Sequence, residues 1–328
     1  MTLTFHKVHG SGNTFYLHEE VTNTTYNWPL TAQKMCDPSN ENGADGLLII
    51  SPSNKADARM RVYNADGSEA SMCGNGLRCV ARFVLSKSGK QSATIETMKA
   101  VLTVQKVDSI FKTIDTYAVE ISPVSFELSS LPMNYQNNGQ IINEIVPEFS
   151  KDIHFTAVSV PNPHLIGIVP IQYIEDTRFQ EQLAASFNRE NDFFPDGVNV
   201  SFVHPVDEKS IFVRTYERGV GFTNACGTAM TASALVSATI NLVPYGETTV
   251  YNPGGFVKCA IEQNDSSTHL SLIGNATFFA TYYGTLNDHY EFSYDSKILH
   301  EEEIKEYEEL EQLAKQKVKD GWSSEEYM

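Results

Sequence analysis

The chain has 328 residues, of which 41% are hydrophobic and 20% are charged, and its formal net charge is −17. This length and composition predict a globular protein with room for two domains, and the negative charge argues against proteins that bind nucleic acid or anionic membranes through basic surfaces. No stretch of about 18 apolar residues occurs and the first residues do not resemble a signal peptide, so we expect no membrane span and a cytoplasmic protein.

The first 121 residues are predicted to form one domain of strands around a central helix. Alternating apolar residues and turn signals predict strands at 2–8, 15–17, 47–50, 58–63, 92–105 and 111–121, and a short helix at 31–36. Apolar residues spaced by three and four follow Cys73 and predict a helix that ends near Lys87. They are Leu77, Val80, Ala81, Val84 and Leu85.

A polar, turn-rich stretch at 122–140 marks the boundary to a second domain, residues 122–285. Strands are predicted there at 155–160, 165–169, 198–203, 210–216, 248–251, 256–261, 269–273 and 276–283, and a helix near 180–188. A second central helix is predicted after Cys226, because apolar residues follow it at helical spacing. They are Met230, Ala234, Leu235 and Ala238.

The remaining residues, 286–328, form an acidic extension in which a helix is predicted at 300–319. Its apolar residues lie roughly on one stripe among glutamates and lysines. Two interpretations stay open from the sequence. The helix docks on this or another subunit, or it is a solvated tail.

The two domains are related by an internal repeat. In each, a Cys-Gly pair follows a tyrosine by ten residues, Tyr63 with Cys73 and Tyr216 with Cys226. Flanking features recur in the same order at an offset of about 150 to 155 residues, as duplication with small insertions would leave them. They are Phe5–Val8 and Phe155–Val158, Asn13 and Asn162, Asp45-Gly46 and Asp196-Gly197, Arg61–Tyr63 and Arg214–Tyr216, and Thr94-Ile95 and Thr249-Val250. We therefore predict an α+β fold of two pseudo-symmetric halves, each a mostly antiparallel sheet or barrel around a central helix.

The five cysteines are odd in number and form no C-x-x-C pair, which is typical neither of a disulfide framework nor of a zinc site. We expect free thiols and no metal, with Cys36, Cys79 and Cys259 as small buried apolar side chains. Cys73 and Cys226 stand where helices begin. Unpaired backbone amides at that position lower a thiol's pKa and attract a carboxylate. We expect the two thiols to face each other in an active site in the cleft between the halves.

Short motifs around both cysteines are specific enough to indicate a family. The first stretch contains Asn64-Ala65-Asp66-Gly67-Ser68-Glu69 and Met72-Cys73-Gly74-Asn75-Gly76-Leu77-Arg78-Cys79. Further motifs are Gly10-Ser11-Gly12-Asn13, Gly43-Ala44-Asp45-Gly46, Val160-Pro161-Asn162-Pro163-His164, Asp196-Gly197-Val198-Asn199-Val200, Tyr216-Glu217-Arg218-Gly219, Ala225-Cys226-Gly227-Thr228 and Pro253-Gly254-Gly255. In content and order, from about residue 5 to 284, they resemble the diaminopimelate epimerase family. Its members interconvert LL- and meso-diaminopimelate without a cofactor.

The resemblance implies a role for each matching residue. Cys73 and Cys226 would be the acid and the base, and His164 and Glu217 would tune their protonation and help to hold the reacting end of the substrate. The implied substrate-binding residues are Asn13, Asn64, Gly74, Asn75, Asn162, Asn199, Glu217, Arg218, Gly227 and Thr228. The resemblance also implies a small-molecule substrate, no cofactor, a homodimer, and a place in the supply of lysine and peptidoglycan precursors.

Two other functions remain open from the residues. The first is a racemase of the same fold that acts on proline, hydroxyproline or histidine, and the second is an amino-acid-binding relative without activity. Oxidation of the two thiols to a disulfide is compatible with an epimerase.

Three positions depart from the family pattern. Phe222 is expected to change the wall beside Cys226, Ala229 stands where glycine is common, and Asn252 stands where an apolar residue is usual.

Overall fold

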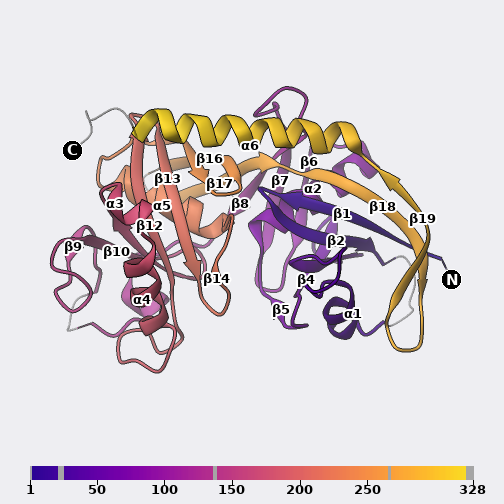
Figure 1. The fold of residues 1–328 in the computed structure, drawn as a ribbon, viewed down its shortest axis with the longest axis horizontal. Coiled ribbons are helices and arrows are strands. Elements are labelled where there is room, and N and C mark those ends of the chain that lie inside the picture. The colour runs from indigo at the N-terminus through magenta and orange to yellow at the C-terminus, as the bar shows by residue number, and fades with distance from the viewer. Residues whose placement is uncertain (1, 21–25, 136–138, 265–266, 323–328) are drawn as a thin grey trace. The chain divides into compact units, whose positions relative to one another are not determined.

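The computed structural model describes residues 2–20, 26–135, 139–264 and 267–322 (Figure 1). The chain forms two compact units. Unit 1 comprises Met1–Glu120 and Ile273–Leu310, and unit 2 comprises Ile121–Leu272 and Glu311–Met328. Among the described residues, no helix combines the length and the apolar character that a membrane crossing requires.

In the sheet of unit 1, most strands pair with the strand that precedes or follows them in the sequence. β1 (Leu3–Gly10) pairs antiparallel with β2 (Asn13–Glu19), β2 pairs parallel with β3 (Gly46–Ser51), and β3 pairs antiparallel with β4 (Ala58–Asn64). β4 then pairs antiparallel with β5 (Glu69–Ala70) and parallel with β6 (Ser92–Glu96). β6 pairs antiparallel with β7 (Val101–Val107), and β7 with β8 (Thr116–Ile121).

The helix α2 (Gly74–Ser88) is the central helix of unit 1, and it packs against strands β1 to β4, β6 and β7. Of the apolar residues predicted on its inner face, Leu77, Val80, Ala81 and Leu85 are buried, whereas Val84 is half-buried. The helix ends at Gly89, whose φ of 69° is the left-handed conformation that favours glycine at this position. The shorter helix α1 (Trp28–Met35) lies near β3 and β4.

Unit 2 repeats the same pairings in the same order. β10 (His154–Ser159) pairs antiparallel with β11 (Pro163–Ile168), β11 parallel with β12 (Asn199–Asp207), and β12 antiparallel with β13 (Ser210–Glu217). β13 pairs antiparallel with β14 (Gly221–Phe222) and parallel with β15 (Gly246–Asn252), which pairs antiparallel with β16 (Gly255–Asn264). β17 (Ser267–Asn275) follows. The predicted α+β class and the internal repeat are confirmed by this shared topology.

The helix α5 (Gly227–Thr239) is the central helix of unit 2 and is buried on all sides as far as Ala238. Alanines, serines and threonines make this possible, because small side chains let the surrounding strands approach closely. Two of the threonine hydroxyl groups donate within the helix, Thr231 Oγ1 to the carbonyl oxygen of Gly227 at 2.9 Å and Thr239 Oγ1 to that of Leu235 at 2.8 Å.

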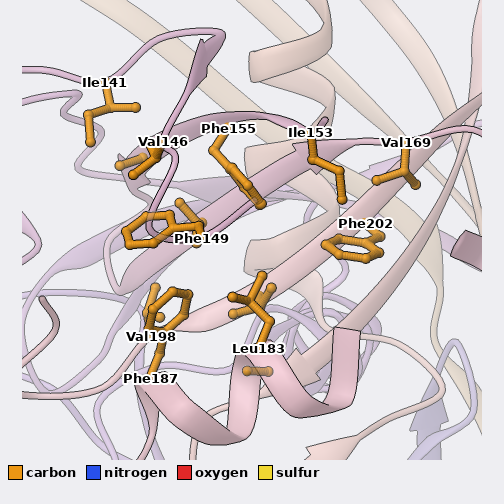
Figure 2. Packing of buried hydrophobic residues seen from close by; sticks show 14 of the residues in the cluster. Ile141, Val146, Phe149, Ile153, Phe155, Val169, Leu183, Phe187, Val198 and Phe202 are labelled. Atoms are coloured by element: carbon orange, nitrogen blue, oxygen red, sulfur yellow. The ribbon is translucent and has the colours of Figure 1, made fainter. Parts of the chain in front are cut away.

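A second apolar cluster of unit 2, which includes no residue of α5, is drawn in Figure 2. Phe187 and Leu183 of helix α4 (Arg178–Phe187) belong to it, together with Phe155 of β10 and Phe202 of β12. Phe149 packs edge-to-face on Phe187, with ring centroids 4.7 Å apart. The short elements around this cluster are the 3-10 helix η1 (Leu128–Ser130), β9 (Glu144–Ile145) and α3 (Gln172–Glu175).

The segment at 122–140, predicted to be polar and turn-rich, contributes apolar side chains to this core. Leu128, Leu131 and Met133 are buried in the cluster. Their spacing fits neither helix nor strand periodicity, so the sequence pattern did not reveal their burial.

The end of the chain returns to unit 1. β18 (Thr277–Leu286) pairs antiparallel with β1 on one side and with β19 (Phe292–Leu299) on the other. Residues 276–283 were expected to complete the sheet of the second half, whereas their partner is the first strand of the chain. The strand β19 was not predicted, since most of its side chains are exposed on both faces and give no alternation.

Helix α6 (Glu301–Trp322) is docked on the chain, which supports the first interpretation of the acidic extension. In unit 1, Tyr307 packs edge-to-face on His9 with ring centroids 4.2 Å apart, and Leu310 is fully buried. Glu303 forms a bidentate ion pair with Arg82, at 2.6 and 2.8 Å. From Glu311 onward the helix belongs to unit 2, where Val318 joins the second apolar cluster.

Candidate active site

Cys73 is the residue immediately before α2, as predicted. Its backbone is extended, with φ −145° and ψ 109°, and its Sγ accepts a hydrogen bond from the amide of Gly76 at 3.4 Å. The sulfur therefore takes the place that a serine or aspartate oxygen takes at many helix starts. The side chain is partly exposed.

Asn13 lies beside Cys73. It begins β2 after a turn in which Ser11 and Gly12 have positive φ angles, and its Oδ1 lies 3.8 Å from Cys73 Sγ. The same Oδ1 accepts from Asn75 Nδ2 at 3.3 Å. Three of the candidate residues of unit 1 are thus brought together.

The other two candidates in unit 1 differ in exposure. Gly74 is the first residue of α2 and is buried. Asn64 ends β4, and its exposed amide donates to Ser68 Oγ at 2.9 Å. This contact holds Asn64 within the turn that leads to Cys73.

Cys226 occupies the equivalent position before α5, with φ −111° and ψ 110°. Its Sγ lies 3.6 Å from Thr228 Oγ1, and only 7% of the residue is exposed. Burial, followed by the negative charge of Glu217, raises the pKa of the Cys226 thiol well above its ordinary value. The Thr228 hydroxyl and the Ala229 amide lower this pKa only in part. The expectation that a helix start lowers the pKa is wrong for Cys226, because the loss of water around the sulfur outweighs the helix donors.

Glu217 ends β13 and is fixed by Thr223, whose Oγ1 donates to Glu217 Oε1 at 2.5 Å. Sequence reasoning assigned Thr223 no role. The contact depends on the short strand β14. Its antiparallel pairing with β13 places Phe222 opposite Tyr216, so the following residue, Thr223, lies near Glu217. Phe222 itself packs edge-to-face on Tyr216, at 5.2 Å between ring centroids.

Replacing Glu217 by glutamine is expected to lower the pKa of Cys226, because it removes a negative charge beside a group that becomes negative on ionisation. Iodoacetamide reacts with thiolates, so labelling of Cys226 should begin at a lower pH than in the parent chain. Peptide mapping by mass spectrometry reports on Cys226 separately from the other thiols. Glu247→Gln, a change at a surface glutamate paired with Lys258, is the matched control and should leave the profile unchanged. An unshifted profile for Glu217→Gln would contradict the assignment.

His164 is fully buried in β11, and its Nε2 bonds to Asn162 Oδ1 at 2.9 Å. An amide oxygen only accepts, so Nε2 carries the hydrogen in this contact. Burial, and then the charge of Arg218, lowers the pKa of His164 to about 3. The imidazole is therefore neutral at physiological pH and acts here as a hydrogen-bonding group, not as a cation.

Arg218 follows Glu217 and is held by its backbone and its side chain. Its amide donates to Asn199 Oδ1 at 2.9 Å, and its Nη1 donates to the carbonyl oxygen of Asp196 at 2.5 Å. Gly197 leaves room for the Arg218 stem, because a Cβ there would lie 2.8 Å from Arg218 Cδ. The parallel pairing of β11 with β12 places His164 opposite Asn199. Unit 2 thus gathers its candidate polar residues at the ends of neighbouring strands.

The remaining candidates in unit 2 are at the start of α5. Gly227 and Thr228 are its first two residues and both are buried. Asn252, one of the departures from the family pattern, is buried near the same helix, with Nδ2 3.0 Å from Met230 Sδ and Oδ1 accepting from the Gly254 amide at 2.9 Å. Asn252 therefore has a local structural role.

Comparison with known proteins identifies relatives of this chain. A family model described as diaminopimelate epimerase matches residues 5–116 and 156–279, which include both cysteines. A Listeria welshimeri protein named diaminopimelate epimerase is 51% identical over 288 residues, covering 84% of this chain and 87% of its own. The chain belongs to the diaminopimelate epimerase family. An Enterococcus faecalis member is 45% identical and matches 97% of this chain and 100% of its own, so most of the acidic extension is included.

Solved structures at low sequence identity share the fold of this diaminopimelate epimerase family member. A PhzF family protein from Bacillus anthracis superposes with a TM-score of 0.64 at 17% identity and covers 87% of this chain and 99% of its own. A hydroxyproline epimerase from Agrobacterium vitis superposes with a TM-score of 0.58 at 14% identity and covers 87% and 92%. At these identities the likeness concerns the fold alone.

Proposed function

We propose that this chain is an isomerase that interconverts LL- and meso-diaminopimelate with two thiols and no cofactor. The observation that carries the proposal is the pair of cysteines, each immediately before the central helix of one of two units with the same topology, in a chain that belongs to the diaminopimelate epimerase family. This reaction supplies meso-diaminopimelate for lysine and peptidoglycan synthesis.

Inversion at an α-carbon needs one group that removes the proton and a second group that returns a proton on the opposite face. We assign these steps to Cys73 and Cys226. In the direction in which Cys226 donates, its raised pKa favours the protonated thiol that an acid needs, and Cys73 removes the proton. In the reverse direction the roles exchange. After one turnover in the direction in which Cys226 donates, Cys73 is a thiol and Cys226 is a thiolate. The starting pair is restored when Cys73 loses one proton to water and Cys226 gains one from water.

The carbanion that forms between the two proton transfers spreads its negative charge into the substrate carboxylate. Amide groups at helix starts stabilise such a charge. We assign this role to the backbone amides of Gly74, Asn75, Gly227 and Thr228, the first residues of α2 and α5. Because both thiols and both sets of amides come from helix starts, each unit supplies one proton-transfer group and one anion site.

The remaining polar residues are assigned to binding. Asn64, Asn162 and Asn199 offer both donors and acceptors for the ammonium and carboxylate groups of an amino acid. His164 stays neutral and holds Asn162 in place. Glu217 lies close enough to Cys226 to raise the pKa of its thiol, and its carboxylate can also accept from a substrate ammonium.

Arg218→Lys is expected to raise the KM for diaminopimelate about tenfold with a smaller change in kcat, because lysine cannot make the two parallel bonds by which arginine grips a carboxylate. Steady-state kinetics measures both constants. Arg178→Lys is the matched control, since Arg178 is a surface arginine of the same unit paired with Asp176. If KM is unchanged in Arg218→Lys, Arg218 does not bind the substrate carboxylate.

The proposal is tested by incubating the protein with LL-diaminopimelate in D₂O and measuring both the meso isomer and deuterium at the α-carbon. Proline, hydroxyproline and histidine are assayed in parallel. Exchange with one of these and not with diaminopimelate would favour the racemase alternative, and binding without any exchange would favour the non-catalytic one. If oxidation abolishes turnover and reductant restores it, disulfide formation is a side reaction of the same two thiols.

We also propose that the protein is a homodimer in the cytoplasm, by likeness to its family. Its five cysteines carry thiols and form no disulfide, as is usual for proteins of a reducing compartment. Light scattering of the purified protein would measure its mass, and a monomer at assay concentration would contradict the dimer. Cell fractionation followed by an activity assay would locate the protein.

A further inference from the structure

The side-chain amides of Asn13 and Asn75 are hydrogen-bonded to each other beside Cys73. Asp45 binds the Asn13 amide, and Arg78 binds the Asn75 amide. We propose that Asp45 and Arg78 are positioning residues that hold Asn13 with its carbonyl oxygen, and not its amino group, against the Cys73 sulfur. Neither residue was assigned to catalysis or binding above. The inference rests on the proposed function only for its activity readout.

Asp45 fixes one end of Asn13. Asp45 Oδ2 accepts from Asn13 Nδ2 at 2.9 Å, from the Thr14 amide at 2.7 Å and from Thr14 Oγ1 at 3.1 Å. A carboxylate only accepts hydrogen bonds, so the Asn13 atom that faces it must be the nitrogen. The oxygen, Oδ1, is thereby turned toward Cys73 Sγ, 3.8 Å away.

The contacts of Arg78, through Asn75, indicate the same orientation of the Asn13 amide. Its Nη2 donates to Asn75 Oδ1 at 3.2 Å, and a guanidinium only donates, so the Asn75 atom that faces Asn13 is the nitrogen. That nitrogen donates to Asn13 Oδ1 at 3.3 Å. The orientation of both amides, which is otherwise ambiguous because oxygen and nitrogen have similar sizes, follows from two independent contacts.

The position of the Arg78 guanidinium is fixed by burial and by hydrogen bonds. It is fully buried, and it also donates from Nε to the carbonyl oxygen of Asn275 at 3.1 Å and from Nη2 to Ser11 Oγ at 2.9 Å. The Ser11 amide in turn donates to Asn275 Oδ1 at 2.8 Å. These bonds fix the position of the guanidinium, so Asn75 Oδ1, and not Nδ2, faces Arg78 Nη2.

The consequence concerns the thiol hydrogen of Cys73. Asn13 Oδ1 accepts that hydrogen and so favours the thiol that Cys73 needs in the direction in which it is the acid, whereas a reversed Asn13 would present an N–H group and favour the thiolate. The opposite influence comes from the Gly76 amide, which donates to the sulfur. Two charged groups contact the two side-chain amides directly, Asp45 in the connection between β2 and β3, and Arg78 of α2.

The test compares Asp45→Ala with Asp45→Asn. Asp45 is exposed, so both variants are expected to fold, and thermal melting checks this. Asp45→Ala releases Asn13, so labelling of Cys73 by iodoacetamide should begin at a lower pH, and kcat/KM should fall about tenfold, mostly through kcat. Asparagine keeps an acceptor for Thr14 and Asn13, so Asp45→Asn should stay within about twofold of the parent in kcat/KM.

Two results would overturn the proposal. The first is an Asp45→Ala labelling profile identical to that of the parent. The second is an Asp45→Asn variant as impaired as Asp45→Ala, since the negative charge and not hydrogen-bond acceptance would then be what matters. The labelling needs no substrate, so failure of the parent chain to turn over diaminopimelate would reject the proposed function while the positioning role is still measured.

Discussion

Alanine at position 73 or at position 226 is expected to reduce epimerisation by about 10²–10⁴-fold, the contribution that a positioned proton-transfer group makes to a rate. Each substitution leaves the proton of one face without a donor or acceptor, so inversion cannot be completed. The measurement is the initial rate of conversion of LL- to meso-diaminopimelate. Both positions lie before helices and not inside them, so the fold should be kept. Cys73→Ala also removes the acceptor for the Gly76 amide and should lower the free energy of unfolding by about 1 kcal/mol.

The other thiols provide matched controls. Cys79 lies in the same helix as Cys73 and is fully buried, and burial raises its pKa to about 12, so it remains a thiol. Cys259 is fully buried in unit 2, with Sγ 3.9 Å from Thr231 Oγ1. Cys79→Ala and Cys259→Ala should retain most of the activity. A Cys73→Ala or Cys226→Ala variant that retains more than about a tenth of the rate would rule out the two-base assignment, given the size of such contributions.

Leu310→Ala is expected to lower the free energy of unfolding by about 2–5 kcal/mol, the usual cost of removing a buried leucine side chain. Leu310 is fully buried in the part of α6 that belongs to unit 1, close in sequence to Tyr307, which packs on His9. Chemical denaturation measures the change. The result would show that the acidic extension is part of the folded unit.

Leu313→Ala is the control for this second prediction. Leu313 lies one turn further along the same helix and is 41% exposed, so its truncation leaves little of a cavity and should cost less than about 1 kcal/mol. Equal effects of the two substitutions would mean that a change of helix propensity, and not burial of Leu310, is responsible. No effect of Leu310→Ala would mean that the first half of α6 is not docked in solution.

Local sequence patterns were sufficient for the elements around the two thiols. The spacing of Leu77, Val80 and Ala81 predicted the inner face of α2, and the duplicated Cys-Gly context predicted where both central helices begin. These features depend on neighbours within a few residues. The motifs also indicated the family, which the comparisons establish.

Features that depend on residues far apart in the sequence could not be predicted from local patterns. The pairing of β18 with β1 joins residues more than 250 positions apart, and nothing in the segment 276–283 indicates that partner. The raised pKa of Cys226 depends on how completely α5 is surrounded, which the sequence of the helix start does not reveal. The sequence assigns Asp45 no role, because its contact with Asn13 forms only when β2 and β3 pair.

The shared strand order of the two units has a consequence for how the thiols diverged. Two copies of one ancestral unit, as separate identical subunits, would give both cysteines the same surroundings and the same acidity. Once both copies are in one chain, each can accumulate its own substitutions. The result is visible here as a fully enclosed helix of small residues behind Cys226 and an arginine-bearing, partly exposed helix behind Cys73. Gene fusion thus permits a pair of thiols with different surroundings, so that the two can differ in acidity even before a substrate binds.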